Sequence, residues 1–228
     1  MIVPNGRRPS LSPRKSRSRG SILLISLLGL LLFREQPAIA EPSDLLASLL
    51  EQFEGVQALS ANFVEQKDIA LLSEPLVNFG RIEYSKPKHL ERRTTRPFES
   101  LWRLDGHTIA VEDGGERTMI DLREYPDASL LATAFMDVLE GDVNLLRKNF
   151  RVSFVPQRAD TPWNITLRPL ESGRRALFKR IEISGLGVLV ERLIIVESSG
   201  DKSTTSFSDV RISPRAHGDP AKDTKGVQ

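Results

Sequence analysis

Three histidines are the residues of this sequence best suited to acid–base or metal chemistry: His89, His107 and His217. Their spacing fits no metal-binding motif, because zinc sites usually place their ligands in closely spaced pairs. Asp105 and His107, taken with Ser100, suggest a hydrolytic triad, in which a histidine takes the proton of an attacking serine. However, Asp105 is followed by glycine, and an Asp-Gly pair between two alternating runs is a strong hairpin signal. The turn accounts for the aspartate, so we expect no catalytic site and no metal or other cofactor.

A basic stretch at residues 80–100, GRIEYSKPKHLERRTTRPFES, raises the question of nucleic acid binding. The charge balance argues against it. The chain has 32 basic and 30 acidic residues, and residues 1–40 hold seven of the basic and one of the acidic ones, which leaves 25 basic and 29 acidic residues. Affinity for nucleic acid comes from neutralising phosphates with Lys and Arg. A remainder with a net charge of −4 is therefore a poor candidate.

The N-terminus has the order of a secretory signal. A basic run ending at Arg19 is followed by an apolar run at 22–33 and by Ala38-Ile39-Ala40. The apolar run is shorter than the roughly 20 residues that a membrane-spanning helix needs. We expect a cleaved signal peptide at 1–40, a single domain at 41–213, a disordered tail at 214–228, and a periplasmic location.

The sequence contains no cysteine. This excludes disulfides, thiol catalysis, Cys-ligated metals and acylation of an N-terminal cysteine. Stability must then come from burial, and a chain of this length buries enough surface to fold as one domain.

Periodicity predicts a mainly β fold with a few helices. The segment PSDLLASLLEQFEGV (42–56) has the apolar spacing of an amphipathic helix, and residues 127–149 predict a second helix broken at Gly141-Asp142. Short alternating runs, each ended by turn residues, predict eleven strands. They lie at 59–67, 76–84, 89–95, 99–104, 107–112, 116–121, 150–155, 163–168, 177–184, 188–197 and 203–212. Eleven consecutive strands favour one large curved sheet or barrel over a parallel α/β core.

Apolar side chains on these strands and on the middle helix either form an ordinary core or line a binding cavity. A single large sheet has two faces, and its concave face can be buried only by covering helices. A concavity closed by separable helices is suited to binding an apolar ligand. The candidate cavity residues are Phe63, Ile82, Tyr84, Leu90, Trp102, Leu104, Leu131, Phe135 and Met136.

Two blocks of the sequence resemble the periplasmic outer-membrane lipoprotein carrier family LolA. LLASLLEQFEGVQALSANFVEQK resembles the family's opening helix, turn and first strand, and GRIEYSKPKHLERRTTRPFESLWRLDG resembles its next block. The resemblance covers roughly 43–213. It implies an unclosed antiparallel β-barrel of about eleven strands with helices packed as a lid over the concave face. It also implies a monomeric carrier that takes the acyl chains of lipoproteins from an inner-membrane donor to an outer-membrane acceptor, without covalent chemistry.

The second block departs from the family pattern at two positions. Lipoprotein carriers have an arginine before the first proline, which hydrogen-bonds the lid helices, whereas this chain has Lys86. Lysine lacks the planar five-donor fork of arginine, which calls a bidentate lid latch into question. After that proline, strand parity places Leu90 and Arg92 toward the cavity. Arg92 is either part of a solvated pair with Arg93 at the sheet rim or a contact for an anionic group of the cargo.

Three functions remain open from the sequence. The first is a carrier of lipoproteins or of a related lipid, such as a fatty-acid-derived product, in outer-membrane biogenesis. The second is a sensor or scaffold that detects lipids or lipoproteins on the same fold. A lipid hydrolase is the third and is disfavoured, because the histidines supply no credible catalytic set.

Overall fold

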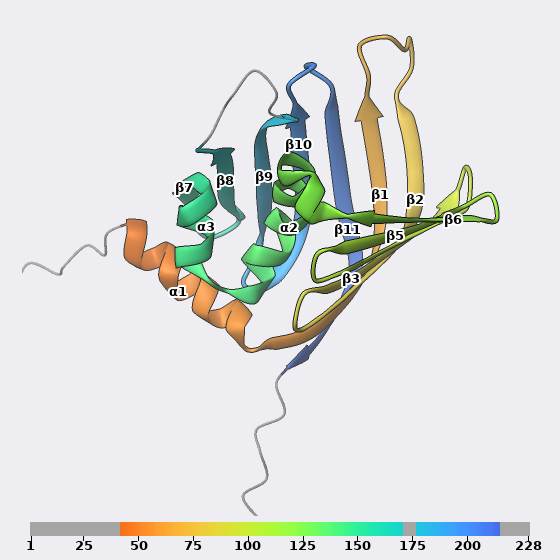
Figure 1. Ribbon diagram of the computed structural model, residues 1–228. Coiled ribbons are helices and arrows are strands. Elements are labelled where there is room, and N and C mark those ends of the chain that lie inside the picture. Colours follow the sequence, from red (N-terminus) through yellow and green to blue (C-terminus); the bar gives the residue numbers. More distant parts are fainter. Residues whose placement is uncertain (1–41, 171–176, 215–228) are drawn as a thin grey trace, which may run out of the picture. The chain divides into compact units, whose positions relative to one another are not determined.

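The computed structural model describes residues 42–170 and 177–214 (Figure 1). The predicted signal peptide and nearly all of the predicted tail lie outside these residues. Pro214 is the exception, since it ends the last strand rather than opening the tail. Among the described residues, none of the helices is both long and apolar enough to cross a membrane.

Eleven strands form one antiparallel sheet in the order β6-β5-β4-β3-β2-β1-β11-β10-β9-β8-β7. The strands are β1 (Val56–Asp68), β2 (Leu76–Ser85), β3 (His89–Arg96), β4 (Ser100–Asp105), β5 (Thr108–Asp113), β6 (Glu116–Asp121), β7 (Phe150–Val155), β8 (Trp163–Pro169), β9 (Phe178–Leu186), β10 (Leu189–Glu197) and β11 (Lys202–Pro214). Because β6 and β7 do not pair with each other, the sheet is unclosed. The predicted fold class and strand count are confirmed, and the predicted boundaries agree to within a few residues.

Three α-helices pack on one face of this sheet. They are α1 (Pro42–Glu54), α2 (Pro126–Glu140) and α3 (Val143–Asn149), with a short 3₁₀ turn, η1 (Leu122–Glu124), before α2. The segment from η1 through α3 connects the two edge strands, β6 and β7. Since that connection cannot be a hairpin, the chain crosses the sheet as helices, and these helices cover the sheet face (Figure 1).

The break between α2 and α3 lies where the sequence predicts it. Gly141 ends α2 with a φ of 85°, a left-handed conformation that glycine adopts without a steric cost. A Cβ at this position would lie 2.5 Å from the carbonyl oxygen of Leu50, so the close approach of α1 also requires glycine. Asp142 then caps α3 by accepting hydrogen bonds from the backbone N–H groups of Asn144 and Leu145, at 2.9 and 3.0 Å.

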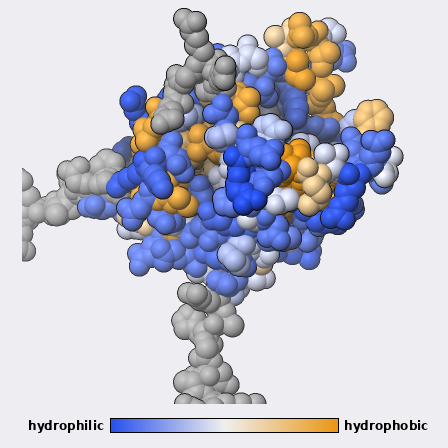
Figure 2. Space-filling model, viewed as in Figure 1, coloured by the Kyte–Doolittle hydropathy of each residue, from blue (hydrophilic) through white to orange (hydrophobic). Residues whose placement is uncertain are grey.

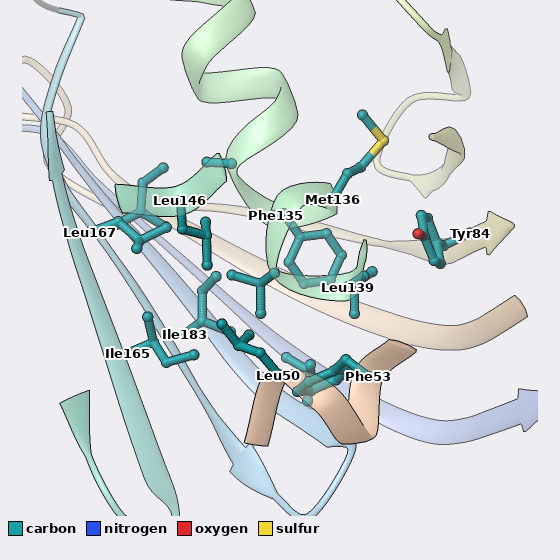
Figure 3. Close-up of a cluster of buried hydrophobic side chains, with 14 of the residues drawn as sticks. Leu50, Phe53, Tyr84, Phe135, Met136, Leu139, Leu146, Ile165, Leu167 and Ile183 are labelled. Atoms are coloured by element: carbon teal, nitrogen blue, oxygen red, sulfur yellow. The ribbon is translucent and has the colours of Figure 1, made fainter. Parts of the chain in front are cut away.

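The core lies between the helices and one face of the sheet (Figure 3). Leu50 and Phe53 of α1 pack with Leu139 of α2 and Leu146 of α3 against the sheet. The sheet contributes β-branched and leucine side chains, among them Ile165, Leu167 and Ile183. The Phe53 ring meets the Trp163 indole edge-on, with a centroid distance of 6.0 Å. Burial of this apolar face is the main force that holds the helices on the sheet.

Candidate functional site

The strand residues predicted to line a cavity share the helix-covered face of the sheet. In the register of β2 to β5, one cross-strand row contains Tyr84, Leu90, Leu104 and Ile109, and the next contains Ile82, Arg92, Trp102 and Val111. Leu59 and Ala61 of β1 pair with Tyr84 and Ile82 and continue both rows. Phe63 follows on the same strand and face, because side chains two residues apart point to the same side. We call this side the inner face of the sheet.

The helical candidates cover part of the inner face rather than leaving all of it open. Phe135 stacks on Phe207 of β11 with a centroid distance of 6.0 Å, Met136 is fully buried, and Leu131 is half-buried against the core. Most of the predicted cavity residues therefore contact one another in this conformation. Trp102 is the clear exception, since 45% of its surface is exposed. Their role in ligand binding stays a prediction.

Lys86 holds the C-terminal ends of two helices. Its Nζ donates to the carbonyl oxygens of Phe53 and Glu54, at 3.1 and 3.0 Å, and to that of Glu140 at 3.5 Å. The last carbonyls of a helix lack donors within the helix, and the helix dipole favours a cation there. The acceptors are three separate carbonyls, so a compact ammonium group with three N–H donors serves them without a planar fork.

Four further side chains complete this arrangement, which we call the latch cluster. The Tyr84 hydroxyl donates to Glu140 Oε1 at 2.6 Å, and the backbone N–H of Lys88 donates to the same oxygen at 3.0 Å. Lys88 Nζ lies 3.4 Å from Asp137 Oδ1. The latch cluster thus joins the β2–β3 turn to α2 through Tyr84, Lys86, Lys88, Asp137 and Glu140.

Burial dominates the electrostatics of the latch cluster. The Asp137 side chain is only 2% exposed, and desolvation raises its pKa above the ordinary value although Lys88 opposes the shift. Burial, together with the hydrogen bond to Glu140, also raises the pKa of Tyr84, which keeps the hydroxyl protonated as a donor. Sequence reasoning found Lys86 but missed Lys88, Asp137 and Glu140. Two acidic residues three apart on a largely apolar helix were the available signal.

Arg92 faces the inner side of the sheet, as strand parity predicts. Its Nη2 donates to Glu65 Oε2 at 2.7 Å and its Nη1 to Thr94 Oγ1 at 3.1 Å. The guanidinium carbon lies 4.3 Å from the centroid of the Phe63 ring, a cation–π geometry. Arg93 points to the opposite face, where its Nη2 lies 3.3 Å from Glu91 Oε1. The two arginines therefore do not act as a pair.

Glu65 is a buried carboxylate that sequence reasoning missed. Besides the bond from Arg92, it accepts hydrogen bonds from Asn78 Nδ2 at 2.9 Å and from Ser203 Oγ at 2.8 Å. Burial alone would raise the pKa of Glu65, but Arg92, Lys67 and the hydrogen bonds lower it below the ordinary value. The available signal was the alternation along β1. Glu65 follows Leu59, Ala61 and Phe63 at two-residue spacing, so its side chain points to the same inner face.

A groove of about 230 Å³ opens on the inner face above this ion pair. Its walls come from the first five strands and the β3–β4 turn, and they include Glu65, Lys67, Asn78, Arg92, Thr94 and Trp102. Beside it, the loop between β1 and β2 carries exposed apolar side chains. Leu71 is 93% exposed and Leu72 is 46% exposed, and apolar residues gather over this loop in Figure 2.

The residues of the suggested triad are not brought together. Ser100 begins β4 and Asp105 ends it, so about 16 Å of extended strand separates them at 3.3 Å per residue. His107 lies in the turn after Asp105. Within residues 42–170 and 177–214, no group of three or more His, Asp or Glu side chains is placed to hold a metal ion.

An unclosed antiparallel sheet with helices over its apolar face is the architecture that the sequence resemblance implies. Residues 40–211 match the family described as outer membrane lipoprotein carrier protein LolA-like, and the chain belongs to this family. The resemblance stated from the sequence is thereby confirmed.

The chain is similar to outer-membrane lipoprotein carrier proteins of two Cupriavidus species. It is 26% identical to that of Cupriavidus taiwanensis over 203 residues, which cover 86% of this chain and 90% of the relative. It is 26% identical to that of Cupriavidus pinatubonensis over 185 residues, covering 78% and 81%. Among solved structures, it matches a LolA superfamily protein of Nitrosomonas europaea with a TM-score of 0.40 and 10% identity, over 73% of this chain and 92% of the other.

Proposed function

We propose that this chain is an exported carrier that shields the acyl chains of a lipoprotein, or of a related lipid, on the inner face of its sheet. It carries the cargo between a donor at the inner membrane and an acceptor at the outer membrane. The carrier acts as a monomer, without a cofactor and without covalent chemistry. Export rests on the N-terminal sequence pattern of residues 1–40.

The observation that carries this proposal is the way the inner face is covered. The helices that bury it are held by apolar packing and by hydrogen bonds concentrated at one end, in the latch cluster. Such contacts can separate and re-form without breaking the strand pairing of the sheet. Acyl chains that replace the helix side chains would gain about 0.8 kcal/mol per buried methylene. The same face can thus be a core when the carrier is empty and a lipid site when it is loaded.

Direction of transport follows from differential affinity. A ligand shifts the equilibrium between two conformations of a protein only to the extent that its affinities for the two conformations differ. Cargo favours the state in which α2 is displaced, whereas the latch cluster favours the covered state. Release to an acceptor is therefore assisted by re-formation of the core, in which Phe135 stacks again on Phe207.

The test is native mass spectrometry of the full chain purified from the periplasm of its host. We expect bound species with the mass of acylated lipoprotein or free lipid. Leu131→Asp places a charge on the inner side of α2 and should abolish co-purification, whereas Leu189→Asp, at an exposed strand end, should not. Circular dichroism checks that both variants fold. A wild-type protein that carries no lipid and binds no acylated peptide after delipidation would overturn the proposal.

A further inference from the structure

The inner face of the sheet changes from apolar to polar along the strands. The row through Tyr84, Leu90, Leu104 and Ile109 is wholly apolar or aromatic, and the row through Ile82, Arg92, Trp102 and Val111 is mixed. The third row contains Gly80, Thr94, Ser100 and Asp113. Same-face residues in a strand are about 7 Å apart, so the change is complete within about 14 Å. The groove lies on the polar side of this boundary.

Two cations at the groove retain capacity to bind an anion. A guanidinium has five N–H donors. The hydrogen bonds of Arg92 to described residues occupy one N–H on each of its two terminal nitrogens, Nη1 and Nη2. Lys67 lies at the groove wall with its Nζ 3.9 Å from Glu65 Oε2, and its side chain is 43% exposed. Two carboxylates, those of Glu65 and Asp113, also line the groove. Asp113 belongs to β5, which lies two strands from Arg92 and four from Lys67 in the sheet.

Glu65 acts as a positioning residue for Arg92. Its two oxygens accept from Arg92, Asn78 and Ser203, which come from three different strands. The carboxylate is therefore held in place and in turn holds the guanidinium over the Phe63 ring. A fixed cation loses little conformational entropy when a ligand binds, which favours affinity.

We propose that this groove binds the anionic head group of the cargo, a carboxylate or a phosphate, through Arg92 and Lys67. The acyl tail then runs from the groove past Trp102 toward Leu90 and Leu104. This inference rests on the proposed carrier function and adds to it the class of head group and the orientation of the cargo. Charge-assisted hydrogen bonds from Arg to these anions are the interactions that recognise them.

Three ligands with one tail and different heads test the head-group site: hexadecanoate, hexadecyl phosphate and hexadecanol. We expect delipidated protein to bind the better of the two anions about 10- to 100-fold more tightly than the alcohol. Comparison of hexadecanoate with hexadecyl phosphate identifies which anionic head group the groove prefers. Arg92→Met should remove the preference and leave the affinity for hexadecanol unchanged. Arg93→Met, on the opposite face of the same strand, should leave all three affinities unchanged.

The outcomes separate this inference from the carrier function. Equal wild-type affinity for all three ligands overturns the head-group site and leaves the carrier intact. Equal weakening of all three by Arg92→Met also overturns it, since that result indicates a structural role only. Failure of all three to bind contradicts the carrier function itself. If Arg92→Met does not fold because Glu65 is left unpaired, the three ligands are compared in the double variant Glu65→Gln with Arg92→Met, which removes both charges of this ion pair.

Orientation has its own readout in the two tryptophans of the chain. Trp102 borders the groove, whereas Trp163 is buried in the core against α1. We expect hexadecanoate brominated next to its carboxylate to quench Trp102 fluorescence more than hexadecanoate brominated at the tail end. Trp102→Phe should abolish that difference. Stronger quenching of Trp102 by the tail-end bromine would overturn the proposed orientation.

Discussion

The two ends of the sheet's inner face use the same residue chemistry for different purposes. At the latch end, the cations Lys86 and Lys88 contact helix carbonyls and acidic residues of α2, so their interactions join separable elements. At the groove end, Arg92 contacts Glu65, and both belong to strands of one sheet. The first set of contacts can change when helices move. The second set lies within one sheet and does not depend on the placement of the helices, which suits the head-group site proposed above.

The two buried carboxylates also differ in what their surroundings do to them. Both are desolvated, but Glu65 has a close arginine and two further hydrogen-bond donors, whereas Asp137 has one partly exposed lysine at 3.4 Å. The pKa of Glu65 is consequently lowered and that of Asp137 raised. Partner geometry, rather than burial alone, therefore decides the sign of each shift.

The largest expected effect is the loss of a core aromatic ring at the latch end. Phe53→Ala removes a fully buried side chain from the contact between α1 and Trp163 and should lower the free energy of unfolding by about 3–5 kcal/mol. Phe98→Ala is the matched control at the groove end, where the ring is 80% exposed, and should change it by less than about 0.5 kcal/mol. Urea unfolding measures both. A similar loss of unfolding free energy in both variants would contradict the division of the inner face into a packed latch end and an open groove end.

A smaller effect is expected from the latch lysine. Lys86→Met leaves the helix carbonyls without their shared donor and should lower the free energy of unfolding by about 1.5–3 kcal/mol. Lys86→Arg should restore most of the loss. Hydrogen exchange locates the effect: amide exchange should rise near the C-termini of α1 and α2 and stay unchanged in β3. A rise confined to the strands would show that Lys86 stabilises the turn instead of the helices.

The smallest effect is a pH dependence of opposite sign at the two ends. The folded-state pKa of Glu65 is lowered from 4.5, so its contribution to stability is present above pH 4.5 and is lost as the pH falls through the folded value. The folded-state pKa of Asp137 is raised from 3.8, so the protein loses stability as the pH rises from 3.8 through the folded value.

Two isosteric variants test these signs. Relative to wild type, Glu65→Gln should become less stable as the pH rises from about 3 to 6, whereas Asp137→Asn should become more stable over the same range. Chemical unfolding at a series of pH values measures both differences. If the stability differences of the two variants from wild type changed with pH in the same direction, this result would contradict the opposite pKa shifts of Glu65 and Asp137.

The amino-acid sequence determined the elements and the faces of this protein. The eleven strands, the three helices and the break at Gly141-Asp142 follow from local periodicity and turn chemistry, which act within a few residues. Parity placed Leu90 and Arg92 on the inner face for the same reason, because alternation along a strand is a local property. The family resemblance rested on the order of these local features.

Only the tertiary structure decided what the side chains on those faces contact. Glu65 meets Arg92, 27 residues away, and Ser203, 138 residues away, and no local pattern carries such pairings. Lys86 finds acceptors at the ends of two helices that lie on either side of it in the chain. The helices also fill much of the inner face, where the sequence left both a core and a cavity open. The physical reason is that hydrogen bonding and packing depend on which elements the folded sheet brings together, whereas periodicity depends only on neighbours in the chain.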